Sequence, residues 1–183
     1  MSAIMRYIIV ICSLFLVSCA SEYAVKTGLD LAPNAGIYLS DPPVSLDVDN
    51  WQQVLTVKHN TEQHTLLAQL NLSSETGINL VVMTVQGMPI FQLEKAPLGA
   101  VKSEKMLPIS GVDLRYILAD IMLVHWPIDV LNAQLYGLVI DEQGTTRRLY
   151  QGKRLISEIQ FLDSQTKLVN YERDYSIIFQ RVN

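Results

Sequence analysis

The chain has 183 residues, of which 49% are hydrophobic and 17% charged, a composition that excludes an intrinsically disordered protein and supplies enough apolar side chains for one core. Its formal net charge is −4 and no basic cluster occurs, which argues against nucleic acid as a partner. The sequence contains no nucleophile elbow, zinc-protease motif, P-loop or dinucleotide-binding motif, so we expect neither an enzyme nor a cofactor.

Residues 1–18 have the layout of an export signal. Arg6 and the α-amino group precede an apolar run from Tyr7 to Val17. A helix of this length spans roughly 16 Å, far less than the ~30 Å hydrocarbon core of a bilayer. The run therefore predicts a cleaved signal peptide rather than a transmembrane helix.

The end of this run, Leu16-Val17-Ser18-Cys19, resembles the lipobox of bacterial lipoproteins. The resemblance implies cleavage before Cys19, a diacylglycerol on its thiol and a further acyl chain such as palmitate on its amino group. Because Ala20 rather than aspartate follows, it also implies the periplasmic face of the outer membrane. Cys12 lies in the removed segment, so no other cysteine would remain for a disulfide or a metal. The alternative is an ordinary secretory signal with an incidental Cys19.

Residues 19–50 lack a sustained hydrophobic period, which predicts a lipidated N-terminus and a tether. Glycine and proline recur along this stretch, at Gly28, Pro33, Gly36, Pro42 and Pro43. A short part of it, residues 36–39, could still pack. We expect a single folded domain over residues 51–183.

From Trp51 onward, apolar and polar residues alternate as in antiparallel strands. A four-residue loop at 60–63 would pair Val57 with Leu66 and Leu55 with Ala68, so that all four face one side. Short connections favour one antiparallel sheet. Further strands are expected at residues 78–86, 89–95, 101–106, 134–140, 147–151, 154–161, 166–171 and 175–182.

One strong helix interrupts the strands. A capping box from Ser110 to Asp113 predicts a helix over 112–124, which residues 125–127 (His-Trp-Pro) end, and a short second helix follows at 128–133. The first helix has apolar residues on two faces, whereas a helix that covers a sheet needs only one. We therefore expect it to be fully buried, or to place its second face against something apolar that the sequence does not supply.

This order of elements resembles the LolA/LolB-like fold, a strongly curved antiparallel half-barrel whose helices fill its concave side. Residues 117–120 (ILAD), 125–127 (HWP), 147–148 (RR) and 175–178 (YSII) resemble more closely an uncharacterised family of outer-membrane lipoproteins associated with aryl polyene biosynthesis clusters. The resemblance implies a mainly β, α+β fold with a helical insertion over the concave face. It also implies an apolar cavity that accepts an acyl or polyene chain.

Two sets of residues are candidates for such a site. The walls and rim of the cavity would come from the helix and the residue after it: Ile117, Leu118, Ile121, Met122 and Trp126. The polar mouth would come from Asp120, Arg147 and Arg148. Since Arg147 and Arg148 are neighbours on a strand, we expect them on opposite faces, where one could bind a lipid headgroup. The alternative is that both are solvated strand arginines. Asp120 should pair with an arginine, lie in water or have a raised pKa. A packed core is the alternative for the apolar set.

His59 and His64 flank the first predicted hairpin loop, and two ligands are too few for a usual zinc site, so we expect no metal. The functional prediction is a non-enzymatic outer-membrane lipoprotein that binds or hands over a hydrophobic, lipid-like molecule in the periplasm. The membrane contact would be the lipid anchor. One alternative is a structural or partner-binding envelope lipoprotein with a packed core. The other is an enzyme that acts on acyl conjugates, for which no nucleophile can be named.

Overall fold

The computed structural model describes residues 28–108 and 113–182, and these form a mainly β protein with two short helices. The predicted signal peptide, Cys19 and Ser110 lie outside the described residues. Ten strands form one antiparallel sheet in the order β7-β6-β5-β4-β3-β13-β12-β11-β10-β9, and three short strands form a second sheet in the order β1-β2-β8. The strands are β1 Gly28–Ala32, β2 Ala35–Tyr38, β3 Val48–His59, β4 Glu62–Ser73, β5 Gly77–Thr84, β6 Pro89–Lys95, β7 Val101–Lys105, β8 Leu135–Tyr136, β9 Val139–Gln143, β10 Thr146–Gln151, β11 Arg154–Leu162, β12 Gln165–Asn170 and β13 Tyr175–Arg181.

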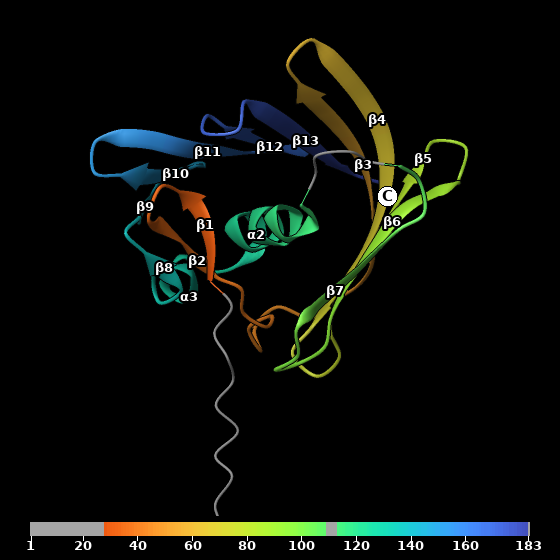
Figure 1. Cartoon of the computed structure of the whole chain (residues 1–183), viewed down its shortest axis with the longest axis horizontal. Helices are drawn as coiled ribbons and strands as arrows, with labels where there is room; N and C mark the ends of the chain where they lie inside the picture. Colours follow the sequence, from red (N-terminus) through yellow and green to blue (C-terminus); the bar gives the residue numbers. More distant parts are fainter. Residues whose placement is uncertain (1–27, 109–112, 183) are drawn as a thin grey trace, which may run out of the picture.

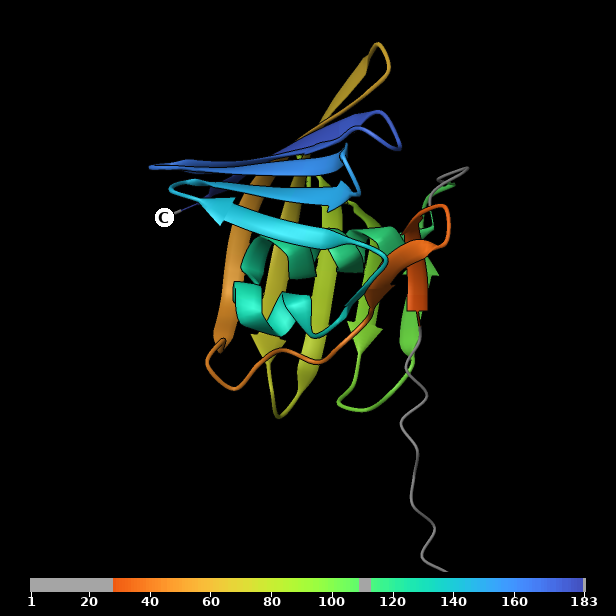
Figure 2. The ribbon, with the colours of Figure 1, turned by 90° about the vertical axis from the view of Figure 1, so that its left-hand side faces the viewer.

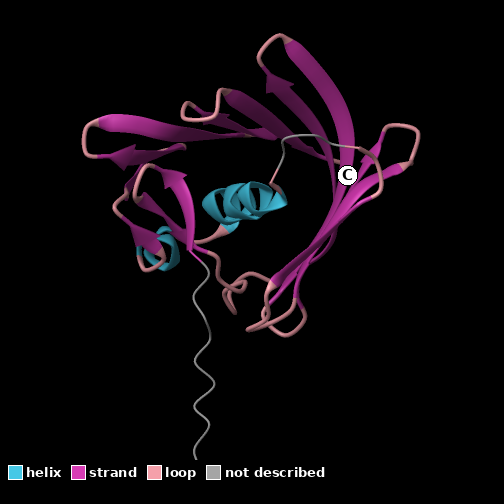
Figure 3. Ribbon diagram, viewed as in Figure 1, coloured by secondary structure: helices cyan, strands magenta, loops and turns pink. Residues whose placement is uncertain are grey.

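The large sheet bends around a helix (Figure 1). Helix α2 (Leu114–His125) lies on its concave side, and the shorter α3 (Ile128–Asn132) follows (Figures 2 and 3). The sheet stays open, with β7 and β9 as its two edges. The predicted fold class, a curved antiparallel sheet with a helical insertion over its concave face, is confirmed. No helix in the described part of the chain is long and apolar enough to cross a membrane.

The alternation of side chains explains why the concave side is the core. Leu70 of β4 lies opposite Leu80 of β5, and Leu80 lies opposite Leu93 of β6; all three are buried. The residues that alternate with these leucines along β4 and β5 point to the convex side and are only partly buried. A period of two therefore places one apolar row on each strand against the helix.

The hairpin of β3 and β4 has a shorter loop than predicted. Its turn consists of Asn60 and Thr61 alone, so that Leu55 lies opposite Leu66 and Val57 opposite His64. The predicted register is therefore wrong by two residues. Asn60 has a φ of 53°, a left-handed conformation that asparagine tolerates well. A shift of two residues preserves the face on which each side chain lies, so the apolar face is the predicted one.

The strand predicted over 134–140 is two strands that belong to different sheets. β8 pairs with β2, whereas β9 pairs with β10. Gly137 separates them with a φ of 66°, and a Cβ at this position would lie 2.8 Å from the Cβ of Ala35. Glycine thus permits both the left-handed turn and the close approach to β2.

The stretch predicted as a tether is partly folded. β1 and β2 form a hairpin whose Leu29, Leu31 and Ile37 side chains are buried in the core. A Cβ at Gly36 would lie 2.0 Å from the Leu29 carbonyl oxygen, so the close pairing of the two strands requires glycine there. The folded domain therefore includes residues from Gly28 onward and does not begin at residue 51.

Helix α2 begins at Leu114, two residues later than predicted. Asp113 is its N-cap, and the carboxylate accepts a hydrogen bond of 3.0 Å from the Arg115 backbone N–H. The helix ends as predicted, with an extended Trp126 before Pro127. It contacts β1 as well as β12. The β1–β2 hairpin therefore covers the second apolar face of the helix, and the segment predicted as a tether is what that face packs against.

Candidate functional site

The apolar residues predicted as cavity walls lie on α2, but most of them are completely packed. Leu118, Met122 and Trp126 have 0% exposure, and Ile121 has 4%. The Trp126 indole N–H donates a hydrogen bond of 3.1 Å to the Ser40 hydroxyl. Ile117 alone of the five predicted residues keeps partial exposure. These residues therefore pack α2 into the core, and they do not line an open cavity.

Asp120 lies in the middle of α2 and is buried, with 4% exposure. The Tyr175 hydroxyl donates a hydrogen bond of 2.5 Å to its carboxylate, and the Asn170 side-chain amide donates one of 3.2 Å to the Tyr175 oxygen. Burial raises the pKa of Asp120 to about 7, although the hydrogen bond from Tyr175 and the charge of Arg173 oppose the rise. The raised pKa is one of the outcomes that the sequence predicted for this residue.

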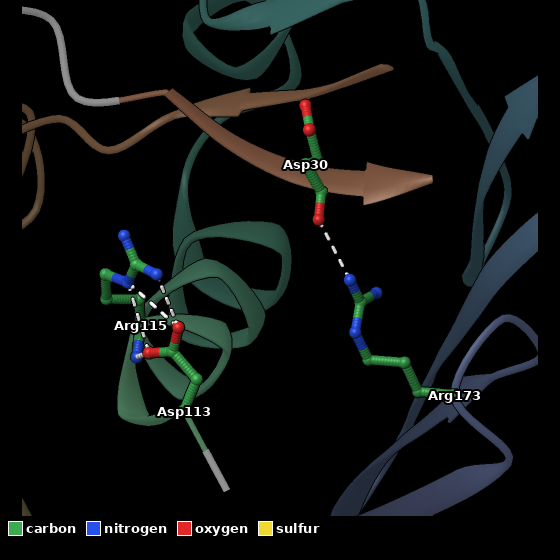
Figure 4. Close-up of polar contacts among 4 residues, drawn as sticks. All are labelled: Asp30, Asp113, Arg115 and Arg173. Carbon is green, nitrogen blue, oxygen red and sulfur yellow. Dashed lines mark hydrogen bonds and ion pairs between the residues drawn. The ribbon is translucent and has the colours of Figure 1, made fainter. Parts of the chain in front are cut away.

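Arg173 lies between the polar residues Asp120, Tyr175 and Asn170 and the N-terminal hairpin of β1 and β2, and it contacts that hairpin. Its guanidinium donates hydrogen bonds to the backbone carbonyls of Asp30, at 2.8 Å, and Leu31, at 2.9 Å, and Figure 4 shows the side chain reaching from the large sheet towards β1. The same guanidinium lies 3.7 Å from the centre of the Tyr116 ring, a cation–π contact. The hairpin, the helix and the β12–β13 turn are thus joined through one side chain.

Arg147 and Arg148 lie on opposite faces of β10, as predicted, and the structure does not bring them together. Arg147 is buried, and its guanidinium donates to the carbonyls of Leu123, at 2.6 Å, and Trp126, at 3.0 Å, at the C-terminal end of α2. It also forms an ion pair of 2.6 Å with Glu142. Arg148 forms an ion pair of 2.7 Å with Glu158 on the other face. Both arginines are therefore already paired within the protein.

The sequence analysis did not predict a role for His125, the last residue of α2. The side chain is partly exposed, but its Nε2 atom is buried and has no hydrogen-bond partner among the described residues. The imidazole lies 5.2 Å from the Trp51 ring, centre to centre, and the Arg181 guanidinium lies 4.9 Å from the centre of the same ring. Burial, with a smaller effect of the Arg147 charge, lowers the pKa of His125 to about 4. The imidazole is therefore neutral at pH 7.

One apolar surface on the concave side is only partly buried. Val57 of β3 lies opposite Ile177 of β13, and Leu66 follows on the inner face of β4. Ile117 lies one helical turn before Asp120, on the side of α2 that faces Tyr175. We call Val57, Leu66, Ile177 and Ile117 the concave apolar surface. Its four side chains pack against the core and keep part of their surface exposed.

Residues 50–183 match a family described as "Protein of unknown function (DUF3261)". The chain belongs to this family. No curated protein matches it. A crystallised domain from Vibrio parahaemolyticus, whose description assigns it to outer membrane lipoprotein sorting, aligns with 73% of this chain and 82% of its own at 11% identity and a TM-score of 0.40.

The DUF3261 match begins inside β3, so the β1–β2 hairpin lies outside the matched segment. The structure nevertheless packs this hairpin against α2, which lies inside it. The matched boundary at residue 50 is close to the predicted domain start at residue 51, and both leave out two strands that contribute buried side chains to the core.

The remaining polar candidates of this DUF3261 protein do not form a site. His59 lies opposite Glu62, while His64 lies opposite Val57 and 3.5 Å from the Glu62 carboxylate, and both histidines are exposed at the tip of the β3–β4 hairpin. Within residues 28–108 and 113–182, no three histidine, cysteine or acidic side chains gather as a metal would require.

A groove of ≈ 320 Å³ lies beside the strands β3, β4, β5 and the end of the chain. Leu67 and Gln69, two of its lining residues, alternate along β4 with buried Ala68 and Leu70, so the groove belongs to the convex side. It is therefore on the opposite face of the sheet from α2. Its lining consists of Gln52, Gln53, Leu67, Ala68, Gln69, Met83 and Val182.

Proposed function

We propose that the protein is an envelope lipoprotein that carries a hydrophobic, lipid-like molecule, with an acyl or polyene chain held against the concave apolar surface. The observation that supports this role is a row of apolar side chains on the inner sheet face whose members Val57, Leu66 and Ile177 are only partly buried. Apolar ligands bind to concave, largely apolar surfaces with a few polar groups at their ends. The concave side combines both features.

The proposed role is not enzymatic. Asp120, the buried acid on the concave side, is held by Tyr175, and Arg147 is held by Glu142 and two helix carbonyls. Neither group lies beside a serine, threonine or cysteine in the hydrogen bonds of the described residues. A carrier needs no nucleophile, so this arrangement agrees with binding rather than with acyl transfer.

The proposed address is the periplasmic face of the outer membrane, through lipid on Cys19. Two or three acyl chains hold a protein on a membrane almost permanently, because each buried methylene contributes about 0.8 kcal/mol. Cys19→Ala should abolish metabolic labelling with palmitate and processing of the signal segment; unchanged labelling would exclude the anchor. Recovery of the wild-type protein chiefly in the inner membrane would exclude the outer-membrane address.

An aryl polyene chain is one ligand within the proposed class.

A structural envelope protein with a packed core is the second candidate, and the total burial of Leu118, Met122 and Trp126 favours it. Neighbouring residues on β4 separate the two proposals. Leu66 faces the concave side, whereas Leu67 faces the convex side, and both are partly buried. A large side chain at Leu66 should therefore obstruct a ligand that the same side chain at Leu67 does not touch.

The experiment is a titration with a fluorescent fatty acid, using a chain from residue 20 onward, which retains every described strand and helix. The carrier proposal predicts saturable binding that Leu66→Trp weakens at least several-fold and that the control Leu67→Trp leaves unchanged. No binding to the wild-type protein would exclude the carrier role and leave the structural one. Equal effects of the two substitutions would place the binding elsewhere.

A further inference from the structure

The C-terminal end of α2 carries a group of side chains that the proposed carrier role does not by itself require. His125 lies beside the Trp51 ring, and Arg181 lies over that same ring. On the other side of the helix end, Arg147 lies 5.3 Å from the centre of the Phe161 ring. Two arginine–aromatic contacts therefore flank one histidine at this end of the concave side.

The histidine presents a polar atom that the protein leaves unsatisfied. His125 Nε2 is buried and has no hydrogen-bond partner among the described residues. A buried polar atom without a partner costs free energy, so such atoms are uncommon in folded proteins. A ligand atom that accepts or donates a hydrogen bond there would remove this cost. The neutral imidazole has one N–H, which allows Nε2 to donate to an oxygen.

The local charge favours an anionic oxygen. Arg147 is neutralised by Glu142, whereas Arg181 is exposed and has no acidic partner among the described residues. The helix C-terminus would ordinarily repel an anion because its free carbonyls carry partial negative charge. Here the Arg147 guanidinium binds the carbonyls of Leu123 and Trp126. The group around His125 therefore has one cation that no acidic side chain of the described residues neutralises, Arg181, and a hydrogen-bonding atom to offer.

We propose that His125, Trp51 and Arg181 form a headgroup subsite that binds the carboxylate of an amphiphile. One carboxylate oxygen accepts a hydrogen bond from His125 Nε2, the Arg181 guanidinium lies beside the same group, and the Trp51 ring packs against the adjoining methylenes. The inference rests on the proposed carrier function, which it extends by naming the chemical class of the ligand.

The position of this subsite suits a long chain. Trp51 and Val57 are six residues apart on β3, a separation of roughly 20 Å along the strand. Val57 belongs to the concave apolar surface. An extended acyl chain that runs from His125 along β3 and β13 to that surface would have to pass the buried side chains of Leu55 and Phe179.

The test uses the three histidines of the chain as internal reporters. Isotope-labelled histidine in the chain from residue 20 onward is followed by NMR during titration with dodecanoate and, separately, with its methyl ester. The proposal predicts that dodecanoate shifts the His125 ring signals and leaves those of His59 and His64, at the distant hairpin tip, unchanged. The ester should bind more weakly and shift His125 less.

Two substitutions complete the test. His125→Phe keeps a ring against Trp51 but removes Nε2, and Arg181→Gln removes the charge of an exposed side chain and keeps a polar side chain at that position. Each should weaken dodecanoate binding, by about tenfold for His125→Phe, while binding of the ester changes less than about twofold. His64→Phe is the matched control and should change neither. Arg181→Gln keeps the test decisive if His125→Phe fails to fold.

The outcomes separate this inference from the proposed function. Dodecanoate binding with unmoved His125 signals, or with equal affinity in the two variants, would overturn the headgroup subsite and leave the carrier role intact. Equal losses for dodecanoate and the ester would make His125 an apolar wall and also overturn the subsite. Failure of the wild-type protein to bind either probe would overturn both proposals.

Discussion

Asp120 and His125 are two ionisable side chains on the same helix, and the protein treats them in opposite ways. Asp120 receives a hydrogen bond from Tyr175, which is itself held by Asn170, so each of the three side chains has a hydrogen-bond partner. The buried Nε2 of His125 has none among the described residues. A satisfied buried group specifies how elements pack, whereas an unsatisfied one marks a place where a ligand can add a bond.

Their pKa values also move in opposite directions for the same physical reason. Burial disfavours the charged form of each side chain, so the pKa of Asp120 rises to about 7 and that of His125 falls to about 4. The native state thus holds a proton on Asp120 that the unfolded chain releases, and lacks a proton on His125 that the unfolded chain binds. The two residues should impose opposite pH dependences on stability.

The largest effect is expected where Arg147 holds the His125 end of the helix. Arg147→Met should destabilise the protein by about 3 to 5 kcal/mol, because it leaves Glu142 and two helix carbonyls without their partner. Arg148→Met removes only the ion pair on the other face and should cost about 0 to 1 kcal/mol. Urea denaturation of both variants measures the difference. Equal costs would show that Arg147 does not anchor the helix.

Asp120→Asn tests the buried acid that has a hydrogen-bond partner. Between pH 4 and 7 the folded wild type binds a proton on Asp120 that the unfolded chain has lost, so its stability falls as the pH rises through that window. The neutral amide avoids this loss while its oxygen still accepts from Tyr175. The variant should therefore exceed the wild type by on the order of 3 kcal/mol at pH 8 and by little at pH 4. A constant difference across the two pH values would contradict the raised pKa.

His125→Phe tests the side chain whose buried Nε2 has no hydrogen-bond partner among the described residues. The pKa of the folded His125 lies below its unfolded value, so its contribution to stability is complete above pH 6.5 and is lost as the pH falls towards 4. The phenylalanine variant should lose on the order of 2 kcal/mol less than the wild type between pH 7 and pH 5. Denaturation at the two pH values measures this difference. Parallel losses in both proteins would show that the imidazole titrates as it does in water.

The smallest effects compare packed and partly exposed positions on α2. Met122→Trp should cost about 1 to 3 kcal/mol, because Met122 has 0% exposure and extra volume would overpack the core. Ile117→Trp should cost less than about 0.5 kcal/mol, because that side chain lies on the partly exposed concave apolar surface. Thermal unfolding of the two variants gives the comparison. Similar melting temperatures would mean that both positions are packed alike.

Much of the fold could be predicted from the sequence because the strong signals are local. Alternation along β3 to β7 and β10 to β13 marks the inner face of each strand, and Trp126-Pro127 marks the end of α2. The β1–β2 hairpin could not be predicted in this way. Its strands have five and four residues, too few for a clear period, and prolines and glycines around them suggest a loop.

The candidate site was less predictable because its contacts join distant parts of the chain. The raised pKa of Asp120 follows from one acid on an apolar helix, but its partner Tyr175 is 55 residues away. The contact of His125 with Trp51 depends on the curvature of the sheet, which brings the start of β3 to the end of α2. The alternation of apolar and polar residues along a strand indicates on which face of the sheet each side chain lies, but it does not indicate how strongly the sheet curves.

Native mass spectrometry of the chain from residue 20 onward, purified from cells without detergent, shows whether the concave side holds an amphiphile. We expect a second species heavier than the protein by the mass of one amphiphile, which Leu66→Trp reduces and Leu67→Trp does not. The bare protein mass alone, in the wild type and in both variants, would mean that the concave side carries no such ligand.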